Sequence, residues 1–145
     1  MVKTGITVMD AMSKNPVYIS PNDNVLESTK LMLEKHVGSL LVKDKENLLG
    51  ILTERDLVRM ISLGIDPRTT KVRQIMTTKI VTITPEKDIY DAIVLMNKEN
   101  LRRLPVTVNG RVIGLITLRD ILTLQPTLFD LILDMVDIRK NHNRM

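Results

Sequence analysis

The feature that most constrains the fold is an internal repeat in the amino-acid sequence. Residues 8–61 align with residues 72–125 at an offset of 64 residues without a gap, and 13 of the 54 aligned pairs are identical. Many of these identities gather at the end of each copy, in the segments 50–56 and 114–120. A repeat of this length predicts two copies of one supersecondary unit, each too small to bury a stable core by itself.

Each copy is expected to have the element order β-α-β-β-α. A short extended segment, the first expected strand, lies at 17–19 or 81–83 and leads to a proline. The helix after it begins with a capping pattern at Asn24 or Asp88. Two apolar runs then predict a pair of strands, and Asn109-Gly110 predicts a tight hairpin between the strands of the second copy. A second helix closes each copy. The expected strand pairs and closing helices are 40–43, 48–52 and 54–63 in the first copy, and 104–108, 112–116 and 118–124 in the second.

The predicted fold class is α+β, with two β-α-β-β-α units in a pseudo-two-fold arrangement that buries both sheets. The joint 64–68 is short and rich in turn-forming residues, which favours one compact double unit. The predicted division is a first unit at 8–61, a linker at 62–71, a second unit at 72–125, and a C-terminal helix with a basic tail at 126–145. The apolar stripe of that last segment fits a helix packed on its own domain, a dimer-forming helix or a helix that docks on a partner.

Composition excludes several kinds of site. The chain has no cysteine, which rules out disulfides, thiolate metal sites and cysteine nucleophiles. Its two histidines, His36 and His142, stand far apart in sequence, so no metal site is expected. No apolar run approaches the roughly 20 residues of a spanning helix, and the start has no signal-peptide core. We therefore expect a cytoplasmic protein without a membrane partner, and, in the absence of a catalytic motif, not an enzyme.

The sharpest motif is Gly50-Ile51-Leu52-Thr53-Glu54-Arg55-Asp56, repeated as Gly114-Leu115-Ile116-Thr117-Leu118-Arg119-Asp120. One interpretation is structural, because Thr-x-x-Asp is close to a capping box, whose cap is worth about 1 kcal/mol. The other interpretation is a binding site. A cap does not require the repeated arginine, whereas a carboxylate can accept hydrogen bonds from the vicinal hydroxyls of a ribose and an arginine can bind phosphate.

These paired endings, together with the stretch Arg102-Arg103-Leu104-Pro105-Val106, resemble a tandem pair of cystathionine-β-synthase-type domains (CBS domains, or a Bateman module) over about residues 8–125. The resemblance implies clefts that bind adenosine-containing ligands: AMP, ADP, ATP or S-adenosylmethionine. It implies homodimers and a regulatory role such as energy sensing, with no required cofactor and the adenine nucleotide as the regulatory ligand.

The resemblance also assigns roles to individual residues. It implies ribose binding by the two aspartates, base contacts from the first strand of each copy and from the start of the next, and phosphate contacts from arginines. The candidate ligand-binding residues are Thr53, Arg55, Asp56, Thr117, Arg119, Asp120, Val17, Tyr18, Ile19, Val81, Thr82, Ile83, Arg102, Arg103 and Pro105.

The two copies differ beside this motif. Where the second copy has Arg102 and Arg103, the first has Gly38 and Ser39, so one cleft is expected to bind phosphate better than the other. Two other functions remain open. The first is a ligand-free protein-interaction or assembly module that acts through its C-terminal helix, whereas a ligand-binding module is expected to act on an unidentified regulated protein or on its own oligomer. The second is nucleic-acid binding through the net charge of +4, which three aromatic residues make the weaker interpretation.

Overall fold

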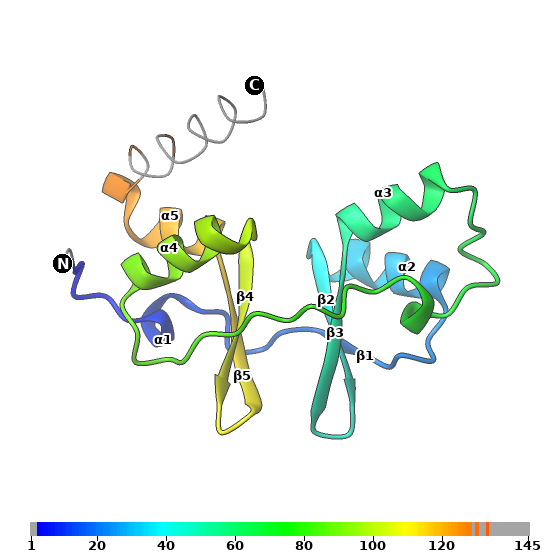
Figure 1. Cartoon of the computed structure of the whole chain (residues 1–145), viewed down its shortest axis with the longest axis horizontal. Helices are drawn as coiled ribbons and strands as arrows, with labels where there is room; N and C mark the ends of the chain where they lie inside the picture. The colour runs from blue at the N-terminus through cyan, green and yellow to red at the C-terminus, as the bar shows by residue number, and fades with distance from the viewer. Residues whose placement is uncertain (1–2, 129, 131–132, 134–145) are drawn as a thin grey trace. The chain divides into compact units, whose positions relative to one another are not determined.

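The computed structural model describes residues 3–128, 130 and 133, and it divides into two compact units. The first-repeat unit is Pro16–Ile80, and the second-repeat unit combines Met1–Asn15 with Val81–Met145. Both contain helices and a small sheet, which confirms the α+β class (Figure 1).

The first-repeat unit is built on a three-stranded sheet in the order β1-β2-β3. Strand β1 runs parallel to β2, and β2 and β3 form an antiparallel hairpin. Two helices supply apolar residues such as Val25, Met32 and Met60 to a core shared with Leu40 and Leu52 of the sheet. The elements of this unit are β1 Tyr18–Ile19, α2 Val25–Lys35, β2 Ser39–Asp44, β3 Asn47–Thr53, α3 Glu54–Ser62 and the 3-10 helix η1 Val72–Gln74.

The second-repeat unit repeats this plan with a shorter sheet. Strands β4 and β5 pair antiparallel, while the expected strand at 81–83 is reduced to one parallel bridge between Ile83 and Val106. Helix residues Ile93 and Ile121 share a core with Leu104 of the sheet. The elements of this unit are α1 Val8–Ala11, α4 Ile89–Glu99, β4 Arg103–Val108, β5 Arg111–Thr117, α5 Leu118–Leu124 and the 3-10 helix η2 Pro126–Leu128.

The opening segments of the two sequence copies lie in exchanged units. Val8 belongs to the core of the second-repeat unit, and its counterpart Val72 belongs to the core of the first-repeat unit. Ser13 makes a two-way backbone pair with Leu115 of β5, as its counterpart Thr77 does with Ile51 of β3. The last strand of each sheet, β3 or β5, is therefore bridged to a segment that the sequence alignment assigns to the other copy.

Local signals account for most element limits. The helix predicted at 118–124 has those limits, and the one predicted at 54–63 ends one residue earlier. Asn109 and Gly110 both have positive φ, 51° and 79°, as a tight two-residue hairpin turn of the primed type requires. Asn24 and Asp88 are N-caps, as predicted.

Only the beginning of the predicted C-terminal helix can be compared with the structure. Residues 126–128 form η2, while the basic tail lies outside the described residues, as do most of the preceding apolar positions. Within the part of the chain that the structure describes, no helix combines the length and the apolar character needed to cross a membrane.

Candidate functional site

The two Thr-x-x-Asp segments lie where the last strand of each sheet leads into a helix. Thr53 is the N-cap of α3 and Thr117 is the N-cap of α5. Each threonine hydroxyl accepts the backbone N–H of its aspartate, at 3.3 Å from Asp56 and 3.1 Å from Asp120. Each aspartate in turn accepts the backbone N–H of its threonine, at 2.9 Å and 3.1 Å. The capping interpretation of the motif therefore holds in both copies.

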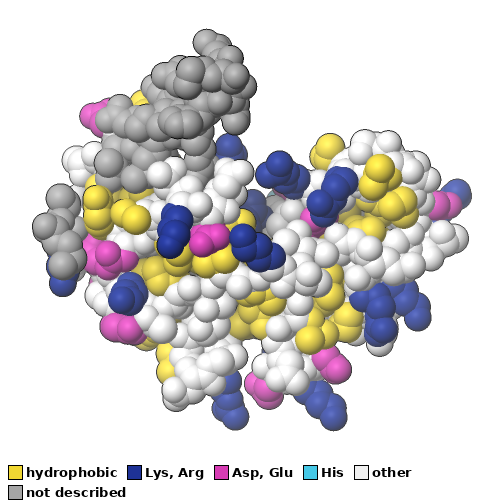
Figure 2. Space-filling model, viewed as in Figure 1, with side chains coloured by type: hydrophobic (Ala, Val, Ile, Leu, Met, Phe, Trp, Pro, Cys, Tyr) yellow, Lys and Arg dark blue, Asp and Glu magenta, His cyan; other side chains and the backbone are white. Residues whose placement is uncertain are grey.

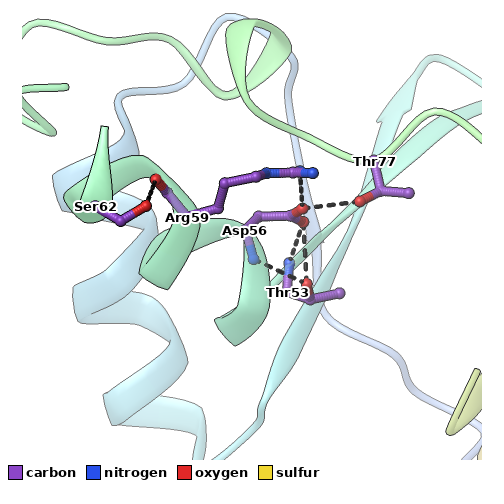
Figure 3. Close-up of polar contacts among 5 residues, drawn as sticks. All are labelled: Thr53, Asp56, Arg59, Ser62 and Thr77. Atoms are coloured by element: carbon purple, nitrogen blue, oxygen red, sulfur yellow. Dashed lines mark hydrogen bonds and ion pairs between the residues drawn. The ribbon is translucent and has the colours of Figure 1, made fainter. Parts of the chain in front are cut away.

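The carboxylate of Asp56 has further partners (Figure 3). Its Oδ2 also accepts the hydroxyl of Thr53 at 3.0 Å. Its Oδ1 accepts the hydroxyl of Thr77 at 2.8 Å and the guanidinium of Arg59 at 2.9 Å. Asp56 is only 3% exposed, whereas the side chain of Arg59 is 63% exposed. A buried charge here is matched by four donors, as buried charges must be.

Asp120 lies in a more open setting. Its Oδ2 accepts the backbone N–H of Thr117, and among the described residues its Oδ1 accepts no hydrogen bond and the carboxylate forms no ion pair. The side chain is half-buried. The position equivalent to Arg59 is Thr123, whose hydroxyl donates to the carbonyl of Arg119. The equivalent of Thr77 is the exposed Ser13.

The second-repeat unit brings three of the predicted phosphate-binding arginines to this motif. Arg103 is the cross-strand partner of Thr117, and the carbonyl of Arg102 accepts the N–H of Leu118 at 2.9 Å. Arg102 and Arg119 are exposed, and Arg103 is half-buried. The structure thus places Arg102, Arg103 and Arg119 around the Thr117-to-Asp120 segment.

The first-repeat unit has no such cluster at the same place. The carbonyl of Gly38 accepts the N–H of Glu54 at 3.3 Å, and Ser39 is the cross-strand partner of Thr53. Arg55 is exposed on α3. The backbone geometry of the two motifs is therefore the same, and the charges beside them differ.

The residues predicted to flank a base differ in accessibility. In the first-repeat unit, Val17 and Tyr18 are half-buried and Ile19 is buried. The ammonium of Lys43 lies 3.9 Å from the centre of the Tyr18 ring, an ordinary cation–π distance. Burial raises the pKa of the Tyr18 hydroxyl, and the charge of Glu46 adds to that effect. One face of this ring is therefore already in contact with a cation.

In the second-repeat unit the corresponding residues are Val81, Thr82 and Ile83. Val81 is half-buried, Thr82 is exposed and Ile83 is buried. Pro105 is buried in β4, and its carbonyl accepts the N–H of Ile83 at 3.0 Å. Val81 packs against the core cluster that includes Leu104.

A pocket of about 320 Å³ is lined by Thr82, Ile83, Thr84, Lys87, Asp91 and Leu95. It shares Thr82 and Ile83 with the predicted base-flanking set. None of the residues that line this pocket belongs to the Thr117-to-Asp120 segment. The described residues contain no group of three or more potential metal-ligating side chains.

Comparison with known families identifies the repeat. The model of the CBS domain matches the chain twice, at residues 8–63 and 72–126. The chain belongs to the CBS domain family. The two compact units with their paired hairpins and helices are those of a CBS pair, or Bateman module, as the resemblance implied.

Several relatives share this CBS pair. The CBS domain-containing protein YhcV of Bacillus subtilis is 33% identical over 116 residues, which are 79% of this chain and 82% of YhcV. Protein MK0525 of Methanopyrus kandleri is 33% identical over 126 residues, and MJ1232 of Methanocaldococcus jannaschii is 35% identical over 118. The match covers 85% and 81% of this chain but only 64% and 38% of those two proteins.

Solved structures of CBS proteins have the same fold. A CBS-domain protein from Burkholderia ambifaria MC40-6 aligns with a TM-score of 0.78 and 32% identity, covering 83% of this chain and 95% of that one. The hexameric CBS-CP12 protein from bloom-forming cyanobacteria aligns with a TM-score of 0.75 and 31% identity, covering 81% and 66%. The CBS pair of protein MJ0100, solved with 5′-methylthioadenosine and S-adenosyl-L-methionine, aligns with a TM-score of 0.75 and 26% identity, covering 82% and 98%.

Two residues of the CBS pair that contact the candidate site were missed by sequence reasoning. Arg59 and Thr77 both bind the carboxylate of Asp56. Arg59 stands three residues after Asp56 on α3, a spacing at which oppositely charged side chains meet, so it could have been inferred. The indication for Thr77 was weaker. The residue before it, Met76, is identical to its counterpart Met12 in the repeat, but Thr77 itself aligns with Ser13.

Proposed function

We propose that this CBS pair is a regulatory module that binds an adenosine-containing ligand, with AMP, ADP, ATP and S-adenosylmethionine as the candidate class. The observation that carries the proposal is the half-buried carboxylate of Asp120, which has an unoccupied Oδ1 among the described residues. The helix that holds Asp120 begins beside Arg102 and Arg103, since Arg103 pairs with Thr117 and the carbonyl of Arg102 accepts the N–H of Leu118. A carboxylate with a free acceptor suits a ribose diol, and neighbouring guanidinium groups suit phosphates. The adenosine ligands bound to the related pair of MJ0100 support the same class.

The proposed mechanism is regulatory and not catalytic. The ligand would change the balance between arrangements of the protein by binding one of them more tightly, since a ligand can shift an equilibrium only through such a difference. The readout would be a change in oligomeric state or in affinity for a partner protein. Nucleic-acid binding has less support, because the described residues include only two aromatic side chains, Tyr18 and Tyr90, on which bases could stack.

The proposal includes a homodimer, which an exposed apolar surface on the first-repeat unit supports. Val58 and Ile61 of α3 are 67% and 69% exposed, and Leu63 just after this helix is 68% exposed. Apolar side chains gather over α3 in Figure 2. Large apolar side chains that gather on a surface mark interaction sites, and a second copy of the chain supplies a matching surface. The hexamer of the related CBS-CP12 protein shows that such pairs assemble in that protein.

A ligand screen by thermal unfolding tests the adenosine proposal. AMP, ADP, ATP and S-adenosylmethionine are added separately to the full chain. GMP is the control for the identity of the base, and ribose 5-phosphate is the control for a sugar phosphate without a base. A ligand at 100 times its dissociation constant stabilises the folded state by about 2.7 kcal/mol, which raises the melting temperature by about 5–10 °C for a chain of this size. A rise with at least one adenine ligand and not with the controls is expected. Equal shifts with GMP or ribose 5-phosphate would contradict the proposed class.

A further inference from the structure

We propose that the two motif aspartates have different roles: Asp56 is a structural tie whose carboxylate is occupied by protein donors, and Asp120 is the residue that accepts ligand hydroxyls. The second half of this statement rests on the proposed function, and the first half does not. The CBS motif by itself treats the two aspartates as equivalent, because Thr53-x-x-Asp56 and Thr117-x-x-Asp120 match in sequence and in capping geometry.

The acceptor sites of Asp56 are filled. A carboxylate offers about four lone-pair sites. Asp56 receives the backbone N–H and the hydroxyl of Thr53 on Oδ2, and the hydroxyl of Thr77 and the guanidinium of Arg59 on Oδ1. A ribose diol needs two acceptor sites, so it would have to displace two of these donors. Because Asp56 is 3% exposed, the ligand would also have to open the site.

Thr77 is not a donor that swings away easily. Its backbone N–H and carbonyl form a two-way pair with Ile51 of β3, both bonds 2.9 Å long, so its position beside the sheet is fixed. Its side chain then reaches Asp56 at the start of α3. Three hydrogen bonds therefore fasten the segment after η1 to both β3 and α3. Such bonds are typical of a structural contact, in which Thr53, Arg59 and Thr77 all donate to the Asp56 carboxylate.

Asp120 has the same backbone setting without this connection. Ser13 makes the same two-way backbone pair with Leu115, but no hydrogen bond joins its side chain to Asp120 among the described residues. The residue in place of Arg59 is Thr123, which donates to a backbone carbonyl. Asp120 therefore keeps Oδ1 as an available acceptor, and Arg102 and Arg103 stand nearby in place of Gly38 and Ser39.

Matched amide substitutions separate the two roles. Asp56→Asn and Asp120→Asn are compared with the unaltered full chain by thermal unfolding and by calorimetric titration with AMP and with ATP. We expect Asp56→Asn to lower the melting temperature by about 4 °C or more and to leave the affinity within about threefold, because it weakens a buried four-donor acceptor. We expect Asp120→Asn to change the melting temperature by less than about 2 °C and to weaken binding at least about tenfold.

A second pair of variants keeps the test valid if Asp56→Asn does not fold. Thr77→Val removes one donor and leaves the carboxylate in place, and Ser13→Ala is its matched control in the other unit. Thr77→Val should lower the melting temperature while leaving AMP binding unchanged, and Ser13→Ala should alter neither. Tighter AMP binding by Thr77→Val, together with binding of a second equivalent of AMP, would show that Asp56 binds ligand once the Thr77 donor is removed. That result would overturn the assignment of Asp56 to a purely structural role.

The outcomes distinguish this inference from the proposed function. Loss of AMP and ATP binding in Asp56→Asn, with a melting temperature within about 2 °C of the unaltered chain, would overturn the division of roles while the proposed function stands. Absence of binding in the unaltered folded chain would contradict the proposed function and the ligand role of Asp120 together. The role of Asp56 as a tie would then be decided by the melting temperatures alone, and equal values for Asp56→Asn and Asp120→Asn would overturn it.

Discussion

Gly50 of β3 lies directly against Met76, such that a Cβ atom on Gly50 would stand 2.9 Å from the Met76 sulfur and 2.7 Å from the carbonyl oxygen of Thr77. The repeat has the same relationship between Gly114 and Met12, with a Cβ-to-sulfur distance of 2.6 Å. The glycine of the CBS motif is thus explained by close approach of another segment.

Substituting Gly50 by alanine should destabilise the chain by about 1–3 kcal/mol, the usual cost of overpacking. The double variant Gly50→Ala, Met76→Ala removes the flexible methionine side chain but leaves the Thr77 carbonyl in place. The clash between the alanine Cβ and this carbonyl should therefore remain, and the stability lost through it should not be recovered. Urea unfolding of the two variants and of Met76→Ala alone measures this. A Gly50→Ala variant as stable as the unaltered chain would show that the segment after η1 does not lie on β3 as described.

Acid should weaken the contact between Asp88 and the N-terminal segment. Burial raises the pKa of Asp88, but hydrogen bonds to its carboxylate have the larger effect, so this pKa lies below its usual value. The donors are the backbone N–H of Tyr90, Thr4 and the N–H of Gly5. A lowered folded pKa stabilises the protein above the unfolded value of about 3.9, and this contribution disappears as pH falls through the folded pKa.

Asp88→Asn is the variant that isolates this effect. At pH 7 it should be less stable than the unaltered chain by about 1 kcal/mol, because asparagine can still cap the helix but hydrogen bonds to a charged acceptor are stronger than those to a neutral amide. The difference should shrink as the pH falls below about 4, because protonation removes the charge from Asp88 itself. Urea midpoints between pH 7 and pH 2.5 measure it, with Glu34→Gln, an exposed change on α2, as the control. A difference that stays constant over this range would contradict the charge-dependent contact.

Arg102 should discriminate ligands by their phosphates. An arginine-to-phosphate hydrogen bond contributes about 1.5–3 kcal/mol, so Arg102→Ala should weaken AMP and ATP binding by about tenfold or more and adenosine binding much less. Calorimetry with the three ligands tests this, and Arg111→Ala, an exposed arginine at the other end of the same hairpin, is the matched control. Equal losses for adenosine and ATP would argue against a phosphate contact.

The apolar surface over α3 should control oligomeric state. Ile61→Glu places a charge where the side chain is 69% exposed, so it should convert a dimer to a monomer without unfolding the chain. Light scattering coupled to size-exclusion chromatography gives the mass. Val108→Glu, an apolar-to-charged change at a 42% exposed position of β4, should leave the mass unchanged. A dimer that persists in Ile61→Glu would exclude this surface as the interface.

Elements with strong local signals were predictable from the sequence. The caps at Thr53 and Thr117, the turn at Asn109-Gly110 and the limits of α5 depend on neighbouring residues, and the structure has them. The regular strand expected at 81–83 did not form, because only Ile83 reaches a partner on β4. Alternation of apolar residues indicates an extended segment but does not decide how many of its residues pair.

Contacts between distant residues were not predictable. Val8 and Val72 look alike in sequence, and nothing local indicates that each joins the core of the other repeat's sheet. Thr77 meets Asp56 only because the chain returns across β3. The different hydrogen-bond partners of Asp56 and Asp120 depend on this return of the chain. The motif is the same in both copies, so it did not predict the difference. The difference between Arg102-Arg103 and Gly38-Ser39 was visible in the sequence, and the structure adds that it lies beside the motif.

The most direct test of the central claim is calorimetric titration of the full chain with AMP, with ADP, ATP and S-adenosylmethionine in parallel. We predict binding of at least one of them in about the micromolar range, near −8 kcal/mol, and its loss in Asp120→Asn. No heat of binding with any of the four ligands, from protein shown to be folded by circular dichroism, would contradict the proposal that this CBS pair is an adenosine-ligand sensor.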